Sequence, residues 1–236
     1  MKRVTGDTSL QSQILETLSD ARSYRRWLAG LVRPYLGEDP IEIGSGNGDY
    51  ALELAAGVKR FTCTDGDEGR CAQLTHQFVD HPIIRARQLF LPTTETDNYT
   101  SAVSFNVLEH IPDDVDAIRS MCRLVRPGGA VVLVVPAFPS AMSRFDLAIG
   151  HERRYTRATM RDVLLAADLD IEVLRYVNPI GLIGWYVTVK ALRMTPHDGL
   201  LVRIYDRTVV PLARVLDRLR IRPFGQSVFA VARVKA

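Results

Sequence analysis

The hydrophobic pattern of the chain alternates between short apolar runs and longer segments with helical periodicity. Residues 41–43, 61–64, 101–105 and 130–135 are apolar runs of the length and composition typical of buried strands. Helical patterns, such as those over residues 50–56 and 157–167, lie between them. This alternation over residues 38–176 predicts an α/β domain whose mostly parallel sheet is covered on both faces.

The two ends of the chain add features to this core. Residues 23–36 predict an amphipathic helix that stops near Pro34 and covers the crevice of the sheet. Near the other end, about fifty residues, 178–226, separate two predicted strands at 170–176 and 227–233, far more than a plain hairpin needs. The first half of this insertion is almost wholly apolar. The second half predicts a helix, kinked or split at Pro211, with an apolar face that includes Leu212 and Val215.

A glycine turn follows the first predicted strand. Gly44, Gly46 and Gly48 alternate with other residues, and glycine allows a ligand to approach the backbone closely. The spacing is GxGxG, which differs from the GxGxxG of dinucleotide enzymes, and no lysine follows as in a phosphate loop. An ordinary glycine turn between a strand and a helix is the alternative interpretation.

Polar residues also follow the next two of these predicted strands. Asp65 ends the strand after the glycine turn, about where an acid that accepts both ribose hydroxyls is expected. Asn106 follows the strand at 101–105. Because the carboxyl ends of parallel strands meet at one edge of a sheet, the glycines, Asp65 and Asn106 are predicted to line one crevice. Asp67 is an alternative ribose ligand, but its position favours a helix N-cap.

These landmarks, together with Asn106-Val107-Leu108-Glu109-His110-Ile111-Pro112 and the later Arg126-Pro127-Gly128-Gly129, resemble class I S-adenosylmethionine-dependent methyltransferases of the methyltransferase 11 type. The resemblance implies a doubly wound, Rossmann-like, mostly parallel seven-stranded sheet with an antiparallel last strand and a helical insertion before it. Residues 1–236 would then form one domain. Its parts would be a helical cover at 1–37, a cofactor-binding core at 38–176, an insertion or lid at 178–226 and a last strand at 227–236.

The resemblance implies S-adenosylmethionine as cofactor and a set of residues that bind it. The glycines would hold its amino acid part, Asp65 its ribose, and Glu42 the loop and the amino group. Tyr24 is a candidate donor to the cofactor carboxylate, with helix packing as the alternative. At the adenine position the chain departs from the family pattern, because Phe90 stands where many relatives carry an acid, so either stacking and backbone groups or Gln88 would hold the ring. The full predicted set is Tyr24, Glu42, Gly44, Ser45, Gly46, Gly48, Asp65, Gly66, Leu89, Phe90, Asn106 and Val107.

Three residues are candidates for the chemistry. Methyl transfer mainly requires alignment of donor and acceptor, and a hydroxyl acceptor must also lose a proton. His110, His151 and Tyr155 are the candidate catalytic residues, the last two within a Gly-His-x-Arg-Arg-Tyr segment that resembles a signature of some bacterial relatives. The alternative for this segment is structural: Thr156 caps the next helix and arginines pair with Asp146 and Glu152.

No metal is predicted at Glu109 and His110, because the sequence places no further ligand near them. The three cysteines are scattered and indicate neither a disulfide framework nor a zinc site.

The composition limits the classes of protein to which the chain can belong. The 236 residues are 47% hydrophobic and 24% charged, which predicts one soluble globular domain, and the polar N-terminus favours a cytoplasmic location. Seven arginines against three aspartates between residues 193 and 222 make the insertion basic, so peripheral membrane contact and a homodimer are both open. The slight net charge of +3 argues against nucleic acid.

The predicted function is methyl transfer to a small-molecule acceptor, at oxygen or nitrogen rather than carbon, with a hydrophobic or lipid- or sugar-linked substrate. The alternatives are a non-catalytic cofactor-binding interaction protein and, less favoured by the glycine spacing, an NAD-dependent oxidoreductase.

Overall fold

A computed structural model describes residues 21–191, 199–218 and 223–235. The strands are β1 (Pro40–Ile43), β2 (Phe61–Asp65), β3 (Ile84–Gln88), β4 (Tyr99–Phe105), β5 (Val125–Pro136), β6 (Leu169–Val177) and β7 (Ser227–Val234). The α-helices are α2 (Arg22–Val32), α3 (Asp49–Leu54), α4 (Glu68–Gln77), α5 (Asp114–Leu124), α6 (Arg144–Ala148), α7 (Arg157–Ala166), α8 (Pro179–Trp185), α9 (Gly199–Ile204) and α10 (Val210–Arg218). Short 3₁₀ turns are η1 (Arg33–Tyr35), η2 (Leu108–His110) and η3 (Pro139–Ala141), and π-helical segments are η4 (Tyr186–Ala191) and η5 (Tyr205–Val209).

The seven strands form one sheet in the order β3-β2-β1-β4-β5-β7-β6. β1 pairs in parallel with β2 and with β4, and β7 is antiparallel to both of its neighbours. The predicted doubly wound, mostly parallel sheet with an antiparallel last strand is confirmed. The insertion before β7 is helical, as predicted.

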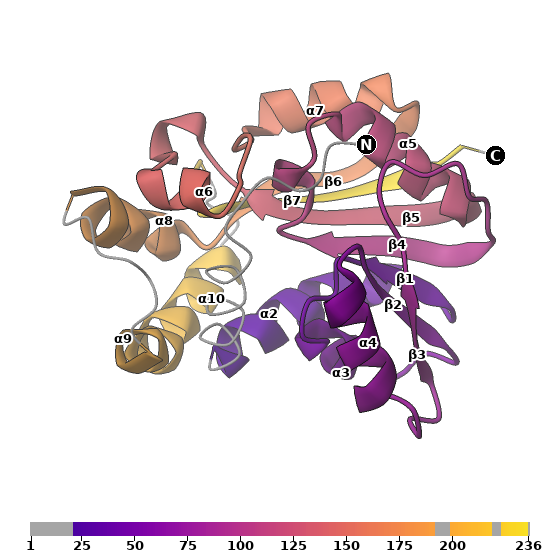
Figure 1. Cartoon of the computed structure of the whole chain (residues 1–236). Coiled ribbons are helices and arrows are strands. Elements are labelled where there is room, and N and C mark those ends of the chain that lie inside the picture. The colour runs from indigo at the N-terminus through magenta and orange to yellow at the C-terminus, as the bar shows by residue number, and fades with distance from the viewer. Residues whose placement is uncertain (1–20, 192–198, 219–222, 236) are drawn as a thin grey trace.

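The helices cover both faces of the sheet (Figure 1). Helices α5 and α7 pack on one face, while α2, α3 and α4 pack on the other. Successive residues of β5 serve opposite cores, since Val131 and Leu133 belong to the first cluster and Val132 and Val134 to the second. This follows from the two-residue period of a strand and explains why β5 is apolar without interruption.

The insertion packs against the N-terminal helix. Trp27 on α2 contacts a cluster with Val210 and Ala213 on α10. The N-cap residue of α2, Ala21, has no side-chain acceptor, and the buried carboxylate of Asp206 accepts hydrogen bonds instead from the backbone N–H groups of Ser23 and Tyr24, at 2.8 Å each. A residue of the insertion therefore caps a helix about 180 residues earlier in the chain.

The apolar face predicted for the last helix is not the side that is buried in the structure. Its buried side includes Val210, Ala213 and Asp217, whereas Leu212 and Val215 are 56% and 53% exposed. The buried aspartate is possible because Arg175 donates to it at 3.1 Å, and a simple hydrophobicity pattern does not register such pairs. Near Pro211, where a kink or split was predicted, the chain passes from the π-helical segment η5 into α10, which begins at Val210.

Part of the predicted cover and insertion, residues 1–20, 192–198 and 219–222, lies outside the described residues. Among the helices that are described, none combines the length and apolar character needed to cross a bilayer. The three cysteines are free thiols.

Asp206→Ala should lower the free energy of unfolding by about 1–2 kcal/mol, because two N–H groups at the start of α2 lose their acceptor. Chemical denaturation followed by circular dichroism measures this change. Thr208→Ala, an exposed substitution in the same π-helical segment, is the matched control. An equal effect of the two substitutions would contradict the capping role.

Candidate functional site

The carboxyl ends of β1 and β4 bring the glycine turn and the segment after Phe105 together. Gly44, Gly46 and Gly48 all have positive φ angles, of 69°, 55° and 75°, a region that side chains disfavour. A Cβ on Gly44 would lie only 2.5 Å from a methyl carbon of Val107. The structure therefore places two predicted cofactor residues from distant parts of the sequence in contact.

The side chain of Ser45 ties this turn to β2. Its hydroxyl accepts a hydrogen bond from the backbone of Thr64 at 3.1 Å, and its own N–H donates to Thr64 at 2.7 Å. Asn106, at the end of β4, is exposed and has a φ of 52°. Asparagine tolerates this left-handed conformation better than most residues, and its exposed side chain directly follows the end of β4.

Asp65, at the end of β2, is hydrogen-bonded to the glycine turn. Its carboxylate is 7% exposed and accepts the N–H groups of Gly46, at 3.1 Å, and of Asp67, at 2.9 Å. A carboxylate has about four acceptor directions, so two remain for the hydroxyls of a ribose. Asp67 instead caps α4 by accepting the N–H of Arg70 at 2.8 Å, which confirms its predicted role as an N-cap.

The predicted adenine region lies next to Asp65. Leu89 donates its N–H to the carbonyl of Asp65 at 3.1 Å, and a Cβ on Gly66 would lie 3.0 Å from the ring of Phe90. The amide of Gln88 already donates to the Gly66 carbonyl at 3.1 Å, whereas the Phe90 ring is 46% exposed. Of the two alternatives for adenine, this arrangement favours stacking on Phe90.

Glu42 is a buried acid under the glycine turn. It is 1% exposed, and its Oε2 has no hydrogen-bond partner among the described residues. Burial raises its pKa to about 8, and the nearby charge of Asp49 adds to the increase. An orphaned carboxylate at this place fits the ammonium group of an amino acid, which is the part of the predicted cofactor that the turn would hold.

The aromatic residues near this acid have packing roles in the structure. Tyr24 lies edge-on to Trp27 with ring centroids 6.0 Å apart, and its hydroxyl is hydrogen-bonded to Ser227 and Asn178. Its contact with a cofactor stays a prediction. Tyr50 stacks on Phe105 with centroids 3.7 Å apart, so it joins the start of α3 to the end of β4. Sequence reasoning missed this pair, although an aromatic residue directly after a glycine turn is a visible signal.

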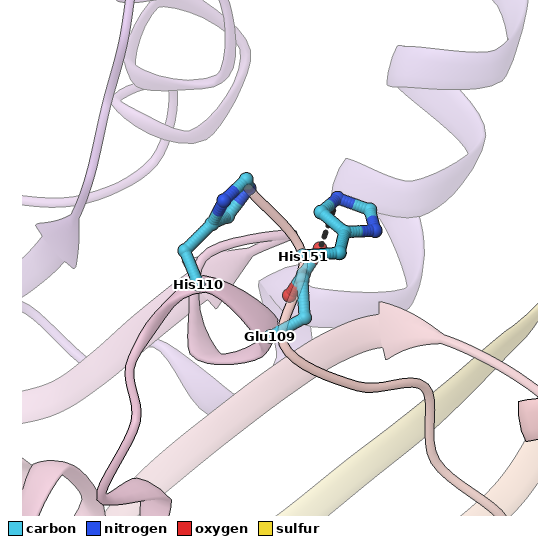
Figure 2. A group of neighbouring side chains, drawn as sticks. All are labelled: Glu109, His110 and His151. Carbon is cyan, nitrogen blue, oxygen red and sulfur yellow. Dashed lines mark ion pairs between the residues drawn. The ribbon is translucent and has the colours of Figure 1, made fainter. Parts of the chain in front are cut away.

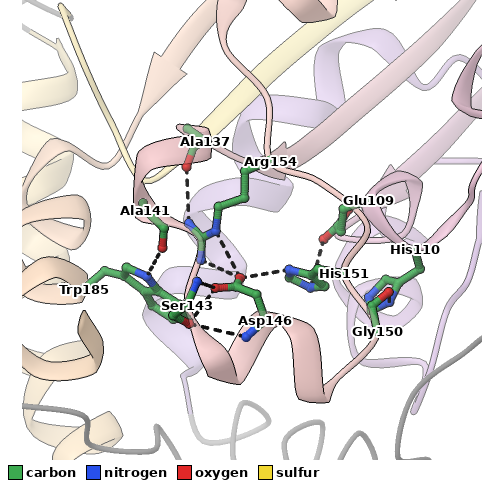
Figure 3. A network of polar contacts seen from close by, with 10 residues as sticks. All are labelled: Glu109, His110, Ala137, Ala141, Ser143, Asp146, Gly150, His151, Arg154 and Trp185. Carbon is green, nitrogen blue, oxygen red and sulfur yellow. Dashed lines mark hydrogen bonds and ion pairs between the residues drawn. The ribbon is translucent and has the colours of Figure 1, made fainter.

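A second polar cluster lies where the chain leaves β5 (Figure 3). Asp146 lies at its centre, and its carboxylate is fully buried. The carboxylate forms a hydrogen bond with His151 Nδ1 at 2.9 Å and accepts one from Arg154 Nη2 at 2.7 Å. Ser143 and Asp146 form a capping box at the start of α6. Burial by itself raises the pKa of Asp146, but the hydrogen bond from His151 and the charge of Arg154 outweigh it and lower the pKa to about 2.

His151 connects Asp146 to the turn after β4 (Figure 2). Its Nε2 lies 3.7 Å from Oε1 of Glu109, a fully buried residue whose two carboxylate oxygens have no hydrogen-bond partner among the described residues. The ring of His110 is edge-on to that of His151 at 4.7 Å, and its Nδ1 lies 3.2 Å from the Gly150 carbonyl. Burial raises the pKa of Glu109 to about 7 and lowers that of His110 to about 4.

Two of the three candidate catalytic residues therefore meet, and the third does not join them. Tyr155 is 1% exposed, and its hydroxyl donates to Asp114 at 2.9 Å, so it is a core residue whose burial does not fit the predicted contact with an acceptor. Thr156 caps α7, as the structural alternative predicted. The argument against a metal is also corrected, because folding brings His151 beside Glu109 and His110 as a third possible ligand.

Comparison with known proteins matches this arrangement to one family. Residues 41–133 match the family described as Methyltransferase domain. This match supports a class I S-adenosylmethionine-dependent methyltransferase domain. The prediction made from the glycine turn, Asp65 and the later motifs is thus confirmed, and the strand order agrees with it.

Relatives of this methyltransferase domain are distant. An uncharacterized methyltransferase of Mycobacterium bovis is 26% identical over 139 residues, which are 58% of this chain and 54% of that protein. One of Mycobacterium ulcerans is 27% identical over 137 residues, 57% of this chain and 53% of that protein. The matched region thus spans about half the length of these relatives.

Solved structures show the same fold at low identity. An S-adenosylmethionine-dependent methyltransferase from Mesorhizobium loti has a TM-score of 0.59 and 18% identity, covering 87% of this chain and 95% of that one. Geranyl diphosphate methyltransferase in complex with S-adenosylmethionine has a TM-score of 0.61 and 12% identity, covering 88% and 84%. The [4+2]-cyclase SpnF has a TM-score of 0.60 and 18% identity, covering 89% and 82%. Because a cyclase shares the fold, the fold does not by itself define the reaction of this methyltransferase domain.

Glu42→Gln should remove a pH dependence from the stability of the methyltransferase domain. The pKa of Glu42 is raised from 4.5 to about 8, so its contribution to stability is fully present below pH 4.5 and is lost as the pH rises toward 8. The free energy of unfolding of the native protein should therefore fall relative to the variant over this range, by at most about 1.4 kcal/mol per pH unit.

Urea denaturation at a series of pH values measures the difference between the two proteins. Glu68→Gln, an exposed substitution at the start of α4, serves as the control and should run parallel to the native protein. A constant difference between the native protein and Glu42→Gln across this range would contradict the burial of an uncompensated acid.

Proposed function

We propose that this protein transfers a methyl group from S-adenosylmethionine to a hydroxyl oxygen of a small-molecule acceptor. The observation that carries the proposal is the adjacency of two sites along one segment. Asn106 and Val107 border the glycine turn, and Glu109 and His110 follow within the next 3₁₀ turn, beside His151. The residues proposed to bind the cofactor are therefore followed directly by a cluster of side chains that can accept a proton.

The residues of the cradle suit the cofactor part by part. The glycine turn offers backbone groups to the amino acid portion, and the unpartnered Oε2 of Glu42 lies beneath it, while Asp65 has acceptor directions left for the ribose. The exposed Phe90 ring offers a face to adenine. When bound, the cofactor supplies a methyl group already activated by a sulfonium, so the protein has mainly to align the acceptor and remove its proton.

The cluster after β4 supports an oxygen acceptor. His151 Nδ1 lies 2.9 Å from Oδ1 of Asp146, and in the neutral tautomer that donates to this carboxylate, Nε2 is the nitrogen able to accept a proton. That nitrogen faces Glu109 at the bottom of the cluster. A hydroxyl needs such a proton acceptor for its attack on a methyl group, so the cluster favours this class of acceptor. His151 is thus the better placed of the two histidines, since the pKa of His110 is depressed to about 4 by burial.

The surface around the insertion supports an apolar acceptor presented at an anionic membrane. Several apolar side chains there are about half exposed or more: Leu147, Ile183, Val187, Ile204, Leu212 and Val215. Arg207 and Arg214 are exposed on the same insertion, while Asp206 and Asp217 are buried. Two of the three aspartates that balance the arginines in the sequence are therefore turned inward, and the described outer surface combines apolar and positive groups, as interfacial helices do.

Calorimetric titration tests the cofactor assignment. S-adenosylmethionine and S-adenosylhomocysteine should bind, and NAD should not, because the glycine spacing lacks the dinucleotide pattern. Asp65→Asn should weaken binding by about tenfold or more, since it replaces an acceptor-only carboxylate with an amide. Asp67→Asn is the control, because asparagine also caps a helix. Binding of NAD alone, or equal affinities for both variants, would contradict the proposal.

Sedimentation with phospholipid vesicles tests the membrane assignment. The full chain should bind vesicles with anionic headgroups and not neutral ones, and exchanging Leu212 and Val215 for glutamine should reduce binding severalfold. Val79→Gln, which replaces a 71% exposed valine just after α4 and outside the insertion, is the control. Absence of binding to anionic vesicles would overturn the assignment, as would a dimer in solution that the same double substitution dissociates.

A further inference from the structure

We infer that Glu109, His110 and His151 form a binding site for a divalent transition-metal cation, of which zinc is the best match. The site itself depends only on the geometry of these residues. Its proposed use, to bind and acidify the acceptor hydroxyl, rests on the proposed methyltransferase function.

The three side chains converge from separate parts of the chain. Glu109 and His110 belong to η2, and His151 comes from the segment after α6. One ligand atom from each residue lies within 4.8 Å of the others, and the pair His151 Nε2 and Glu109 Oε1 is 3.7 Å apart. Around a tetrahedral zinc with bonds of about 2.0–2.2 Å, ligand atoms are about 3.4 Å apart, so small side-chain rotations complete the site.

The second ring nitrogen of each histidine is already engaged. His151 Nδ1 donates to the buried carboxylate of Asp146 at 2.9 Å, and His110 Nδ1 lies 3.2 Å from the carbonyl of Gly150. In the neutral tautomer that donates through Nδ1, each ring has Nε2 available to bind a cation. Metal-binding histidines almost always show this pattern, in which a carboxylate or a carbonyl orients the ring and selects the nitrogen that binds the cation.

Glu109 provides a second, independent indication of a cation site. It is completely buried, and neither of its carboxylate oxygens has a hydrogen-bond partner among the described residues. A buried carboxylate without hydrogen bonds is expensive, and native structures rarely leave both oxygens unsatisfied. A cation between Glu109 and the two imidazoles would satisfy both the charge and the oxygens.

The donor set selects the kind of cation. Two imidazoles and one carboxylate suit zinc and other first-row transition metals, whereas magnesium and calcium prefer sites built from oxygen. The three cysteines are not part of the cluster, so no thiolate contributes. Three protein ligands leave one tetrahedral position open, as in catalytic rather than structural zinc sites.

The open position explains how the cluster would serve the proposed reaction. A cation held by these three residues would increase the acidity of a hydroxyl at the open position, whose proton would pass to solvent. The acceptor oxygen would then bond to the methyl carbon as the sulfur–carbon bond breaks, which would give a methyl ether and a neutral thioether. In this arrangement His151 holds the cation, and the cation takes over the activation that a free imidazole would otherwise provide.

The test is a titration of the untagged full chain, stripped with a chelator, with zinc chloride by calorimetry. The native protein should bind one zinc ion at this site, and Glu109→Gln and His151→Gln should each weaken binding at least tenfold. Circular dichroism and thermal denaturation check that each variant folds. His76→Gln, which changes an exposed histidine on α4, is the matched control and should bind like the native protein.

Cobalt as a spectroscopic substitute gives a second readout. The native protein should show the visible absorption of tetrahedral cobalt without a thiolate charge-transfer band, and Glu109→Gln should lose it. No binding by the native protein, equal binding by all variants, or a thiolate band would overturn the inference.

These measurements need neither the methyl donor nor an acceptor, so the two proposals fail separately. Zinc binding without S-adenosylmethionine binding would overturn the proposed function and leave the metal site standing. The reverse result would overturn only the metal site.

Discussion

The buried carboxylate of Asp146 is the interaction on which the arrangement of the second cluster depends. A charge with no exposure to solvent must be compensated within the protein, and here the guanidinium of Arg154 and the imidazole of His151 provide the compensation. Arg154 also donates to the carbonyl of Ala137 and lies 4.5 Å from the ring of Trp185. One acid therefore ties the exit of β5, the insertion and the segment that carries His151 into a single rigid unit (Figure 3).

A second buried acid, Asp206, also joins distant segments of the chain. Asp206 joins the insertion to the start of α2, whose own N-cap residue lacks an acceptor. The N-terminal helix and the insertion therefore depend on each other, although most of the chain separates them. Removing the insertion would expose Trp27 and leave α2 without its cap. The role of the insertion in recognising an acceptor is therefore better tested by surface substitutions than by deletion.

Much of the cofactor half of the site could be predicted from the sequence because its signals are local. Gly44, Asp65 and Asn106 each follow a strand directly, and a parallel sheet places the ends of these strands at one edge. The polar cluster was only partly predictable. His110 and His151 were recognised as candidates, but 40 residues separate them, and nothing in the sequence indicates that His151 points its Nε2 at Glu109. The same limit explains why the burial of Tyr155 and the approach of His151 to Glu109 and His110 were not predicted.

The α/β fold, the order of its main elements and the glycine turn followed from the sequence, because hydrophobic period, turn glycines and strand-end polar residues act over a few positions. The tertiary structure alone decided which side of α10 is buried, how the insertion joins α2, and that Glu109, His110 and His151 face one another. Each of these outcomes depends on a buried charge finding its partner. Such pairing is a property of three-dimensional distance, and a hydrophobicity pattern scores a buried Asp206 or Asp217 simply as polar.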